Sequence, residues 1–349
     1  MKKIKKNLKG NEKILLLTHN DMDGSGSAVL LKLLYGNNVE VKRLSNGAMD
    51  KVIGEICLSE EEMSKYDYVF ITDISCSPTT ANKIEKSPFA SKVVLLDHHS
   101  TANGLNEFSF AFVASCYEKT FNVKENYGPL KSSGTSLMLD FLLAEDIQIP
   151  NVDLCKYFAH CVAAYDTWDW VYVFDKLETY KNLNSLYYIY GAEYFEDLMV
   201  THLANGSNLF DDISLKLLAV EETKTKDYVD RKEKSMVVLS ETIVGKKYSF
   251  AFCVAESYLA DIFDRMYTNY PEVDFYVVDI GSGLSFRSRT DEMNVAELAK
   301  NFGGGGHPQA SGCRVPYDLR ILTVKSTLKC KGILKDIKVL LNERRRKNG

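Results

Sequence analysis

Acidic residues and histidines follow three apolar runs of this sequence, and their side chains are of the kinds that bind metal ions. They are His19, Asp21 and Asp23 after LLLT, Asp73 after VFIT, and Asp97, His98 and His99 after VVLL. Carboxylates that gather in one place repel each other and lose hydration when buried. Divalent cations relieve both costs. The pattern therefore predicts a divalent-metal site, provided that the fold brings the three runs together.

The apolar runs are typical of strands buried in a parallel sheet. Helical patterns at 24–36 and 132–145 are interleaved with them. Strands that alternate with helices predict an α/β fold with a doubly wound, mainly parallel sheet. In such sheets ligands bind beyond the carboxyl ends of the strands. The expected strands are 13–20, 38–45, 67–75 and 92–99.

Each cluster also has a purely structural explanation when it is taken alone. Asp and Gly are common turn residues after strands, Asp73 could cap a helix, and His98 and His99 could lie on the surface. Three clusters at matching strand ends favour the metal site over these explanations.

The length of 349 residues predicts about two domains. No proline occurs between Pro150 and Pro271, and a long helical pattern lies near the middle of that stretch. We expect a metal-binding domain over 1–210, a connecting helix over 211–235 and a smaller α/β domain over 236–349.

The expected second domain contains arginines and glycines that could bind an anion. Arg287 and Arg289 alternate along an expected strand at 283–289, and guanidinium groups suit phosphate. Glycines let backbone N–H groups approach an anion closely. The candidate glycine-loop residues are Gly304, Gly305, Gly306 and His307. Taken alone, the glycines could be a flexible loop and the arginines a solvated edge strand.

Composition limits the class of protein. The net charge of −4 favours a short or small substrate over long duplex nucleic acid. The eight cysteines are scattered without a C-x-x-C pair, which indicates reduced thiols and a cytoplasmic location. No apolar run reaches the roughly 18 residues that a membrane span needs, so no membrane partner is expected.

The ordered motifs resemble the DHH phosphoesterase superfamily, over about residues 12–315. The signature is the triplet Asp97-His98-His99, with HNDMDG and TDIS before it and AAYDTWDW after it. The nanoRNase or oligoribonuclease group is the most similar in its motifs. The segment 284–313 resembles the DHH-associated substrate-binding domain. Asp166 is the match to the fourth motif, with Asp169 and Asp153 as neighbouring alternatives.

The resemblance implies two divalent ions, with manganese expected and magnesium as the alternative. Asp21 and Asp73 would bind one ion, with His19 as a further candidate ligand. The other ion would be bound by Asp23, Asp73, His98 and Asp166. Asp97 would orient His98, and His99 would face the substrate phosphate. A tryptophan ring at Trp168 or Trp170 could stack on a base or pack in the core, and both readings stay open.

These features predict a metal-dependent phosphodiesterase that hydrolyses short oligonucleotides with a water activated by two metal ions. The alternative substrates are small nucleotides: a cyclic mononucleotide, a linear or cyclic dinucleotide, or 3′-phosphoadenosine phosphate. A non-catalytic nucleotide sensor is the alternative from another class, although a pure binder does not need every metal ligand. A homodimer is one expected assembly.

Overall fold

The computed structural model describes residues 4–45, 47–114, 131–145, 147–172, 178–290 and 292–315. The chain divides into two compact units, Met1–Glu221 and Glu222–Gly349. The helix α10, Asp212–Glu233, spans the border between them. Residues 316–349, which belong to the predicted second domain, lie outside the described part of the chain.

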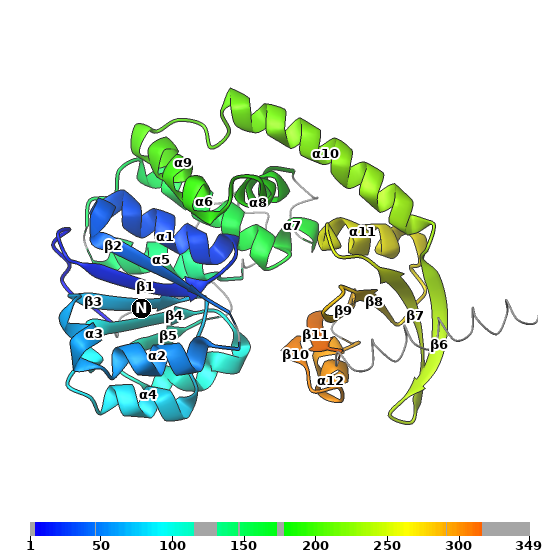
Figure 1. The fold of residues 1–349 in the computed structure, drawn as a ribbon, viewed down its shortest axis with the longest axis horizontal. Helices are drawn as coiled ribbons and strands as arrows, with labels where there is room; N and C mark the ends of the chain where they lie inside the picture. Colours follow the sequence, from blue (N-terminus) through cyan, green and yellow to red (C-terminus); the bar gives the residue numbers. More distant parts are fainter. Residues whose placement is uncertain are drawn as a thin grey trace, which may run out of the picture. The chain divides into compact units, whose positions relative to one another are not determined.

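The first unit contains a five-stranded parallel sheet in the order β2-β1-β3-β4-β5 (Figure 1). The apolar runs form its central strands, and in β4 every residue is buried. The predicted doubly wound, mainly parallel fold is therefore confirmed. The strands are β1 Ile14–His19, β2 Val39–Leu44, β3 Tyr68–Thr72, β4 Val93–Asp97 and β5 Ala111–Val113.

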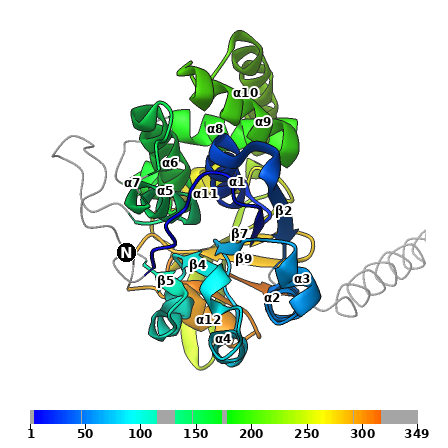
Figure 2. The same cartoon turned by 90° about the vertical axis from the view of Figure 1, so that its left-hand side faces the viewer.

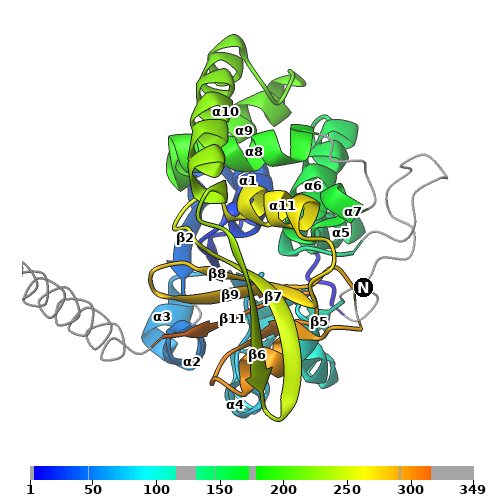
Figure 3. The same cartoon turned by 90° about the vertical axis from the view of Figure 1, so that its right-hand side faces the viewer.

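Helices cover both faces of this sheet. One face carries α2 Met49–Cys57, α3 Glu60–Ser64 and α4 Pro78–Glu85, and the other carries α1 Met22–Tyr35 and α5 Gly134–Ala144 (Figure 1). Further helices extend this second layer, and α8 lies beside α6 and α9 (Figures 1, 2 and 3). They are α6 Val152–Asp166, α7 Asp169–Tyr172, α8 Glu178–Tyr190 and α9 Ala192–Asn205. Short 3-10 turns cover Gly36–Asn38, Ala90–Lys92 and Ser100–Glu107.

Polar residues fix the ends of the two helices that border the strand ends. The Asp21 side chain accepts a hydrogen bond from the Gly24 N–H and begins α1. Ser133 forms a capping box with Ser136 and begins α5. Gly36, with φ 53°, ends α1, as the sequence predicts, because an L side chain would strain this conformation.

The second unit contains a mixed six-stranded sheet in the order β10-β11-β9-β8-β7-β6. The strands β6 and β7 form a long antiparallel hairpin (Figure 3), and the sequence pattern did not predict β6. Part of the glycine segment is strand β10 rather than loop. The strands are β6 Val237–Ile243, β7 Lys246–Val254, β8 Phe275–Asp279, β9 Gly283–Arg287, β10 Gly305–His307 and β11 Ala310–Arg314, with helices α11 Leu259–Asn269 and α12 Val295–Lys300.

Among the described residues, no helix has the length and apolar character that crossing a membrane requires.

Candidate metal centre

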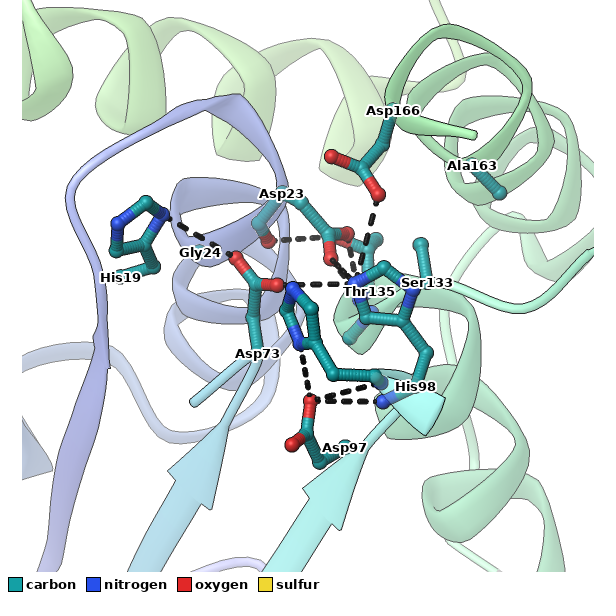
Figure 4. A network of polar contacts seen from close by, with 12 residues as sticks. His19, Asp23, Gly24, Asp73, Asp97, His98, Ser133, Thr135, Ala163 and Asp166 are labelled. Atoms are coloured by element: carbon teal, nitrogen blue, oxygen red, sulfur yellow. Dashed lines mark hydrogen bonds and ion pairs between the residues drawn. The ribbon is translucent and has the colours of Figure 1, made fainter. Parts of the chain in front are cut away.

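The strands β1, β3 and β4 are neighbours in the sheet and end together. Thr18 pairs with Thr72, and Thr72 pairs with Leu96, so the residues that follow lie at one edge. The Thr18 hydroxyl lies 2.9 Å from the Thr72 hydroxyl and fixes the first two ends against each other. This edge brings the three predicted clusters together in one site (Figure 4).

Asp73 lies near the centre of the cluster and is buried. Its backbone φ of 60° is a conformation that Asp and Asn tolerate better than most residues. Its Oδ1 lies 3.1 Å from Nε2 of His98, whereas its buried Oδ2 has no hydrogen-bond partner among the described residues. Burial, and then the charges of Asp23 and Asp21, raise the pKa of Asp73 well above its ordinary value. The Asp73 carboxylate is thus placed where a cation would offset its charge.

His98 connects Asp73 to two further carboxylates. Its Nε2 lies 3.5 Å from Oδ2 of Asp166 and 3.9 Å from Oδ2 of Asp23. Asp166 is the last residue of α6 and reaches the site from the helical layer (Figure 4). Burial, followed by the charge of Asp23, raises the pKa of Asp166 well above its ordinary value.

The two alternatives for the fourth motif lie elsewhere. Oδ2 of Asp169 accepts the backbone N–H of Lys131 at 3.1 Å. The side chain of Asp153 is 92% exposed and pairs with Lys156. The geometry therefore favours Asp166 as the fourth-motif residue at the site.

His19 and Asp21 form the other side of the cluster. Nδ1 of His19 contacts Oδ2 of Asp21 and lies 4.0 Å from Oδ2 of Asp73. Potential ligand atoms lie within 4.8 Å of one another in three groups, and Asp73 belongs to two of them. The groups are His19-Asp21-Asp73, Asp23-His98-Asp166 and Asp73-His98-His99.

The N-terminus of α5 holds Asp23, a contact that the sequence analysis missed. The backbone N–H groups of Gly134 and Thr135 donate to the two carboxylate oxygens of Asp23, at 2.6 and 2.8 Å. The Thr135 hydroxyl also donates to the Asp23 carbonyl at 2.7 Å. A Cβ at Gly134 would lie 2.7 Å from Cβ of Asp73, so this position has no room for a side chain. The segment SSGT at the start of a predicted helix was the available signal.

The Asp97 side chain contacts the ring of His99. This corrects the expectation that Asp97 orients His98. Oδ1 of Asp97 lies 2.7 Å from Nδ1 of His99, and it also accepts hydrogen bonds from the backbone N–H groups of His98 and His99. The His98 ring instead faces Asp73. The two imidazole rings lie 4.3 Å apart between centroids and are tilted by 48°, and each has a different acid as a partner, Asp73 for His98 and Asp97 for His99.

The donor set of this site fits divalent metal ions. It combines buried carboxylates with imidazole nitrogens, and one carboxylate oxygen of Asp73 is buried without a hydrogen bond from any described residue. Such an oxygen is costly to bury unless a cation or a donor meets it. Transition-metal ions suit a site of mixed carboxylate and imidazole ligands better than they suit an all-oxygen site.

Comparison with curated sequences identifies the family. The chain is 32% identical over 313 residues to oligoribonuclease NrnB of Bacillus subtilis, an alignment that covers 88% of this chain and 74% of that protein. The chain belongs to the DHH phosphoesterases, in the oligoribonuclease NrnB group. The family predicted from the motifs is thereby confirmed, although no family model matches the sequence.

Solved structures show weaker similarity. The pGpG-specific phosphodiesterase PggH of Vibrio cholerae has 15% identity and a TM-score of 0.47, with 91% of this chain and 98% of that chain covered. RecJ of Thermus thermophilus in complex with Mn²⁺ has 14% identity and a TM-score of 0.47, with 88% and 50% covered.

In this DHH protein, the predicted substrate-binding residues lie in the second unit. Nη1 of Arg287 donates to Oγ of Ser285 at 3.1 Å and to the Phe286 carbonyl at 2.9 Å. Its guanidinium carbon lies 4.9 Å from the centre of the Phe263 ring. The strand β9 ends at Arg287, so Arg289 lies beyond the strand, where it is exposed. The expected strand over 283–289 is thus two residues too long.

Two of the glycines have a structural reason within this unit. A Cβ at Gly304 would lie 2.1 Å from the Gly312 carbonyl oxygen, and one at Gly306 would lie 2.5 Å from that of Ala310. Gly305 has no neighbouring atom within 4 Å of such a Cβ. The side chain of His307 lies outside the described part of the structure. The close approach of β11 therefore accounts for glycine at 304 and 306, and phosphate binding by this segment stays a prediction.

The two tryptophans follow Asp166. Trp170 is buried, and its ring stacks on Tyr165 with 5.7 Å between centroids. Trp168 is half-buried, 6.5 Å from Trp170, with a φ of 63°. Core packing thus explains Trp170, whereas base stacking by Trp168 stays a prediction.

Proposed function

We propose that this chain is a divalent-metal-dependent phosphodiesterase that hydrolyses short oligonucleotides, with Mn²⁺ as the preferred ion. Membership of the oligoribonuclease NrnB group supports the substrate class. The convergence of carboxylates on the buried Asp73 is the observation that carries the reaction type, because such a cluster needs cations to be stable.

The ligand groups suggest how two ions would be held. His19 and Asp21 would bind one ion, and Asp23, His98 and Asp166 would bind the other, with Asp73 shared between them. When bound, divalent ions at such a site activate water and stabilise charge on a transferring phosphoryl group. Hydrogen bonds from α5 hold both oxygens of Asp23 in a fixed orientation, which prepares the site for binding.

His99 is the group that we assign to the substrate phosphate. Its Nδ1 is held by Asp97, and Nε2 is the nitrogen that we assign to a substrate oxygen. Burial opposes its protonation, but the hydrogen bond and charge of Asp97 outweigh this and raise the pKa of His99 to about 9. A protonated His99 would donate a hydrogen bond to the phosphate or a proton to the leaving oxygen.

The second unit would bind the phosphates of the substrate. Arg287, Arg289 and the segment Gly304–His307 are the proposed phosphate-binding residues, and the net charge of −4 supports a short substrate. A homodimer and a cytoplasmic location stay predictions.

Product analysis on labelled di- to pentanucleotides tests the function, with Mn²⁺, Mg²⁺ or EDTA present. We expect mononucleotide products with Mn²⁺, slower turnover with Mg²⁺ and none with EDTA. Asp166→Asn should lower kcat at least about 10²-fold, since it removes a charged ligand. Asp153→Asn is the matched control on the same helix, because that side chain is 92% exposed. Unchanged turnover in EDTA, or equal loss in both variants, would exclude the proposed site.

A further inference from the structure

Two of the apolar runs that lead to the metal site close with a threonine. The run LLLT of β1 closes with Thr18, and the run VFIT of β3 closes with Thr72. Both side chains are fully buried, where a valine would have the same shape without a polar group. A buried hydroxyl destabilises the fold unless it is hydrogen-bonded. The partners of these two hydroxyls therefore indicate what they stabilise.

The Thr18 hydroxyl makes two contacts with Thr72. Its Oγ1 donates to the Thr72 carbonyl oxygen at 3.0 Å and lies 2.9 Å from the Thr72 Oγ1. A hydroxyl has a single hydrogen, so the Thr72 hydroxyl is the donor in the second contact. The two side chains thus differ in their targets: Thr18 holds a backbone group, whereas Thr72 holds only the other hydroxyl.

The Thr72 carbonyl belongs to the peptide bond that leads into Asp73. The N–H of the same peptide bond donates to the Leu96 carbonyl of β4 at 3.2 Å. Both polar groups of this planar unit are therefore held. Rotation of the plane about the N–Cα bond of Asp73 is the φ angle of that residue, which is 60°. This left-handed conformation is unfavourable for a residue with a side chain and persists only where its surroundings enforce it.

Two helices leave the hydroxyl and the peptide bond little room to move. At the start of α1, a Cβ at Gly24 would lie 2.8 Å from the Thr18 Oγ1 and 2.2 Å from the His19 carbonyl oxygen. At the start of α5, a Cβ at Gly134 would lie 3.0 Å from the backbone nitrogen of Asp73. The close approach of both helices thus favours a single arrangement, in which the Thr18 hydroxyl faces the Thr72 carbonyl.

We propose that Thr18 is a positioning residue of the metal site, which holds the peptide bond before Asp73 so that the Asp73 carboxylate stays at the centre of the cluster. This inference rests on the proposed function, because it takes the cluster to bind divalent ions. Without the Thr18 hydroxyl, rotation of the peptide plane would relieve the left-handed φ. The carboxylate that both ions would share would then move away from the other ligands.

Mn²⁺ titration calorimetry on variants of the threonine pair tests this role. Thr18→Val keeps the shape of the side chain but removes the hydrogen bond to the carbonyl, and we expect the Mn²⁺ affinity to fall about tenfold. Thr18→Ser retains the hydroxyl and should restore an affinity within about threefold of wild type. Thr18→Ala and Thr18→Ser differ only in the hydroxyl, so they give the same comparison if valine prevents folding.

Thr72→Val is the matched control. It removes a buried hydroxyl of the same pair but leaves the contact of Thr18 with the Thr72 carbonyl, so its Mn²⁺ affinity should stay within about threefold of wild type. Melting temperatures in EDTA show whether each variant is folded. An equal loss of affinity in Thr18→Val and Thr72→Val would overturn the proposal, since the pair would then only stabilise the fold.

Crystal structures of the metal-free variants separate failure of this inference from failure of the proposed function. We expect Thr18→Val to lose the contact of 3.1 Å between Asp73 and His98, and Thr72→Val to keep it. If that result is obtained but wild type binds no Mn²⁺, the positioning of Asp73 stands and the proposed function fails. If wild type binds Mn²⁺ but Thr18→Val keeps both the contact and the affinity, Thr18 has no positioning role.

Discussion

Oδ1 of Asp97 lies 2.7 Å from Nδ1 of His99, and this contact separates the tasks of two adjacent histidines. His98 faces Asp73 and the other carboxylates, whereas His99 is held by an acid that lies outside the three groups of ligand atoms. The buried Asp97 thus acts on the histidine assigned to substrate.

Asp97→Asn should therefore impair catalysis more than metal binding. We expect kcat to fall at least about 10²-fold, because His99 loses the charge that favours its protonated form. The Mn²⁺ affinity, measured by titration calorimetry, should stay within about threefold of wild type. His98→Ala provides the comparison, since it should weaken Mn²⁺ binding directly. A Mn²⁺ affinity that falls equally in both variants would show that Asp97 acts through His98.

Asp73→Asn should stabilise the metal-free protein. The substitution removes a charge that lies among other buried carboxylates, and Asn tolerates the left-handed φ of 60°. We expect the melting temperature in EDTA to rise by at least about 2 °C. Saturating Mn²⁺ should raise the melting temperature of wild type but not of this variant. A lower melting temperature of Asp73→Asn in EDTA would contradict the predicted repulsion, and Asp153→Asn should change neither measurement.

Gly134→Ala should disturb the metal site without removing any ligand. Its Cβ would lie 2.7 Å from Cβ of Asp73 and 3.0 Å from Oδ2 of Asp23, so at least one of these side chains must shift. Residues that orient metal ligands typically contribute 10- to 100-fold in affinity, and we expect a loss of about that size in Mn²⁺ titrations. Gly104→Ala is the control, because it has no atom within 4 Å of the added Cβ. Equal Mn²⁺ affinity in the two variants would refute the role of Gly134.

His160 should make the metal-free protein less stable in acid. Burial lowers the pKa of this histidine from 6.5 to about 4. Between these values the unfolded chain binds a proton that the folded chain does not, so stability falls as the pH decreases through this window and is constant above it. The loss should approach about 3 kcal/mol. Urea unfolding in EDTA at several pH values measures it.

His160→Gln should remove most of this pH dependence, because glutamine does not titrate. Its stability at pH 7 should be lower, since the contact of 3.1 Å between Nε2 and the Tyr180 hydroxyl is altered. Identical pH slopes in variant and wild type would rule out the assignment to His160.

The sequence alone determined the elements that build the site and the kinds of ligand they carry. Apolar runs that fill β1, β3 and β4 can be read directly, because a strand buried on both faces needs an unbroken series of apolar residues. The polar residues that follow such runs must lie at one edge, because parallel strands end together. The family motifs then supplied Asp166 from a helix distant in sequence.

Only the tertiary structure decided which partner each of these groups meets. Sequence spacing alone does not distinguish Asp166 from Asp169. In the structure the two lie on either side of a turn, and Asp166 approaches His98 whereas Asp169 accepts a hydrogen bond from Lys131. Sequence likewise did not show that Asp97 holds His99, or that α5 holds Asp23. The contact of Asp97 with His99 depends on the direction of side chains around a single turn. The contact of α5 with Asp23 depends on how a helix packs against a segment far away in the chain. Local patterns fix which residues reach the edge of the sheet, and packing fixes how they face one another.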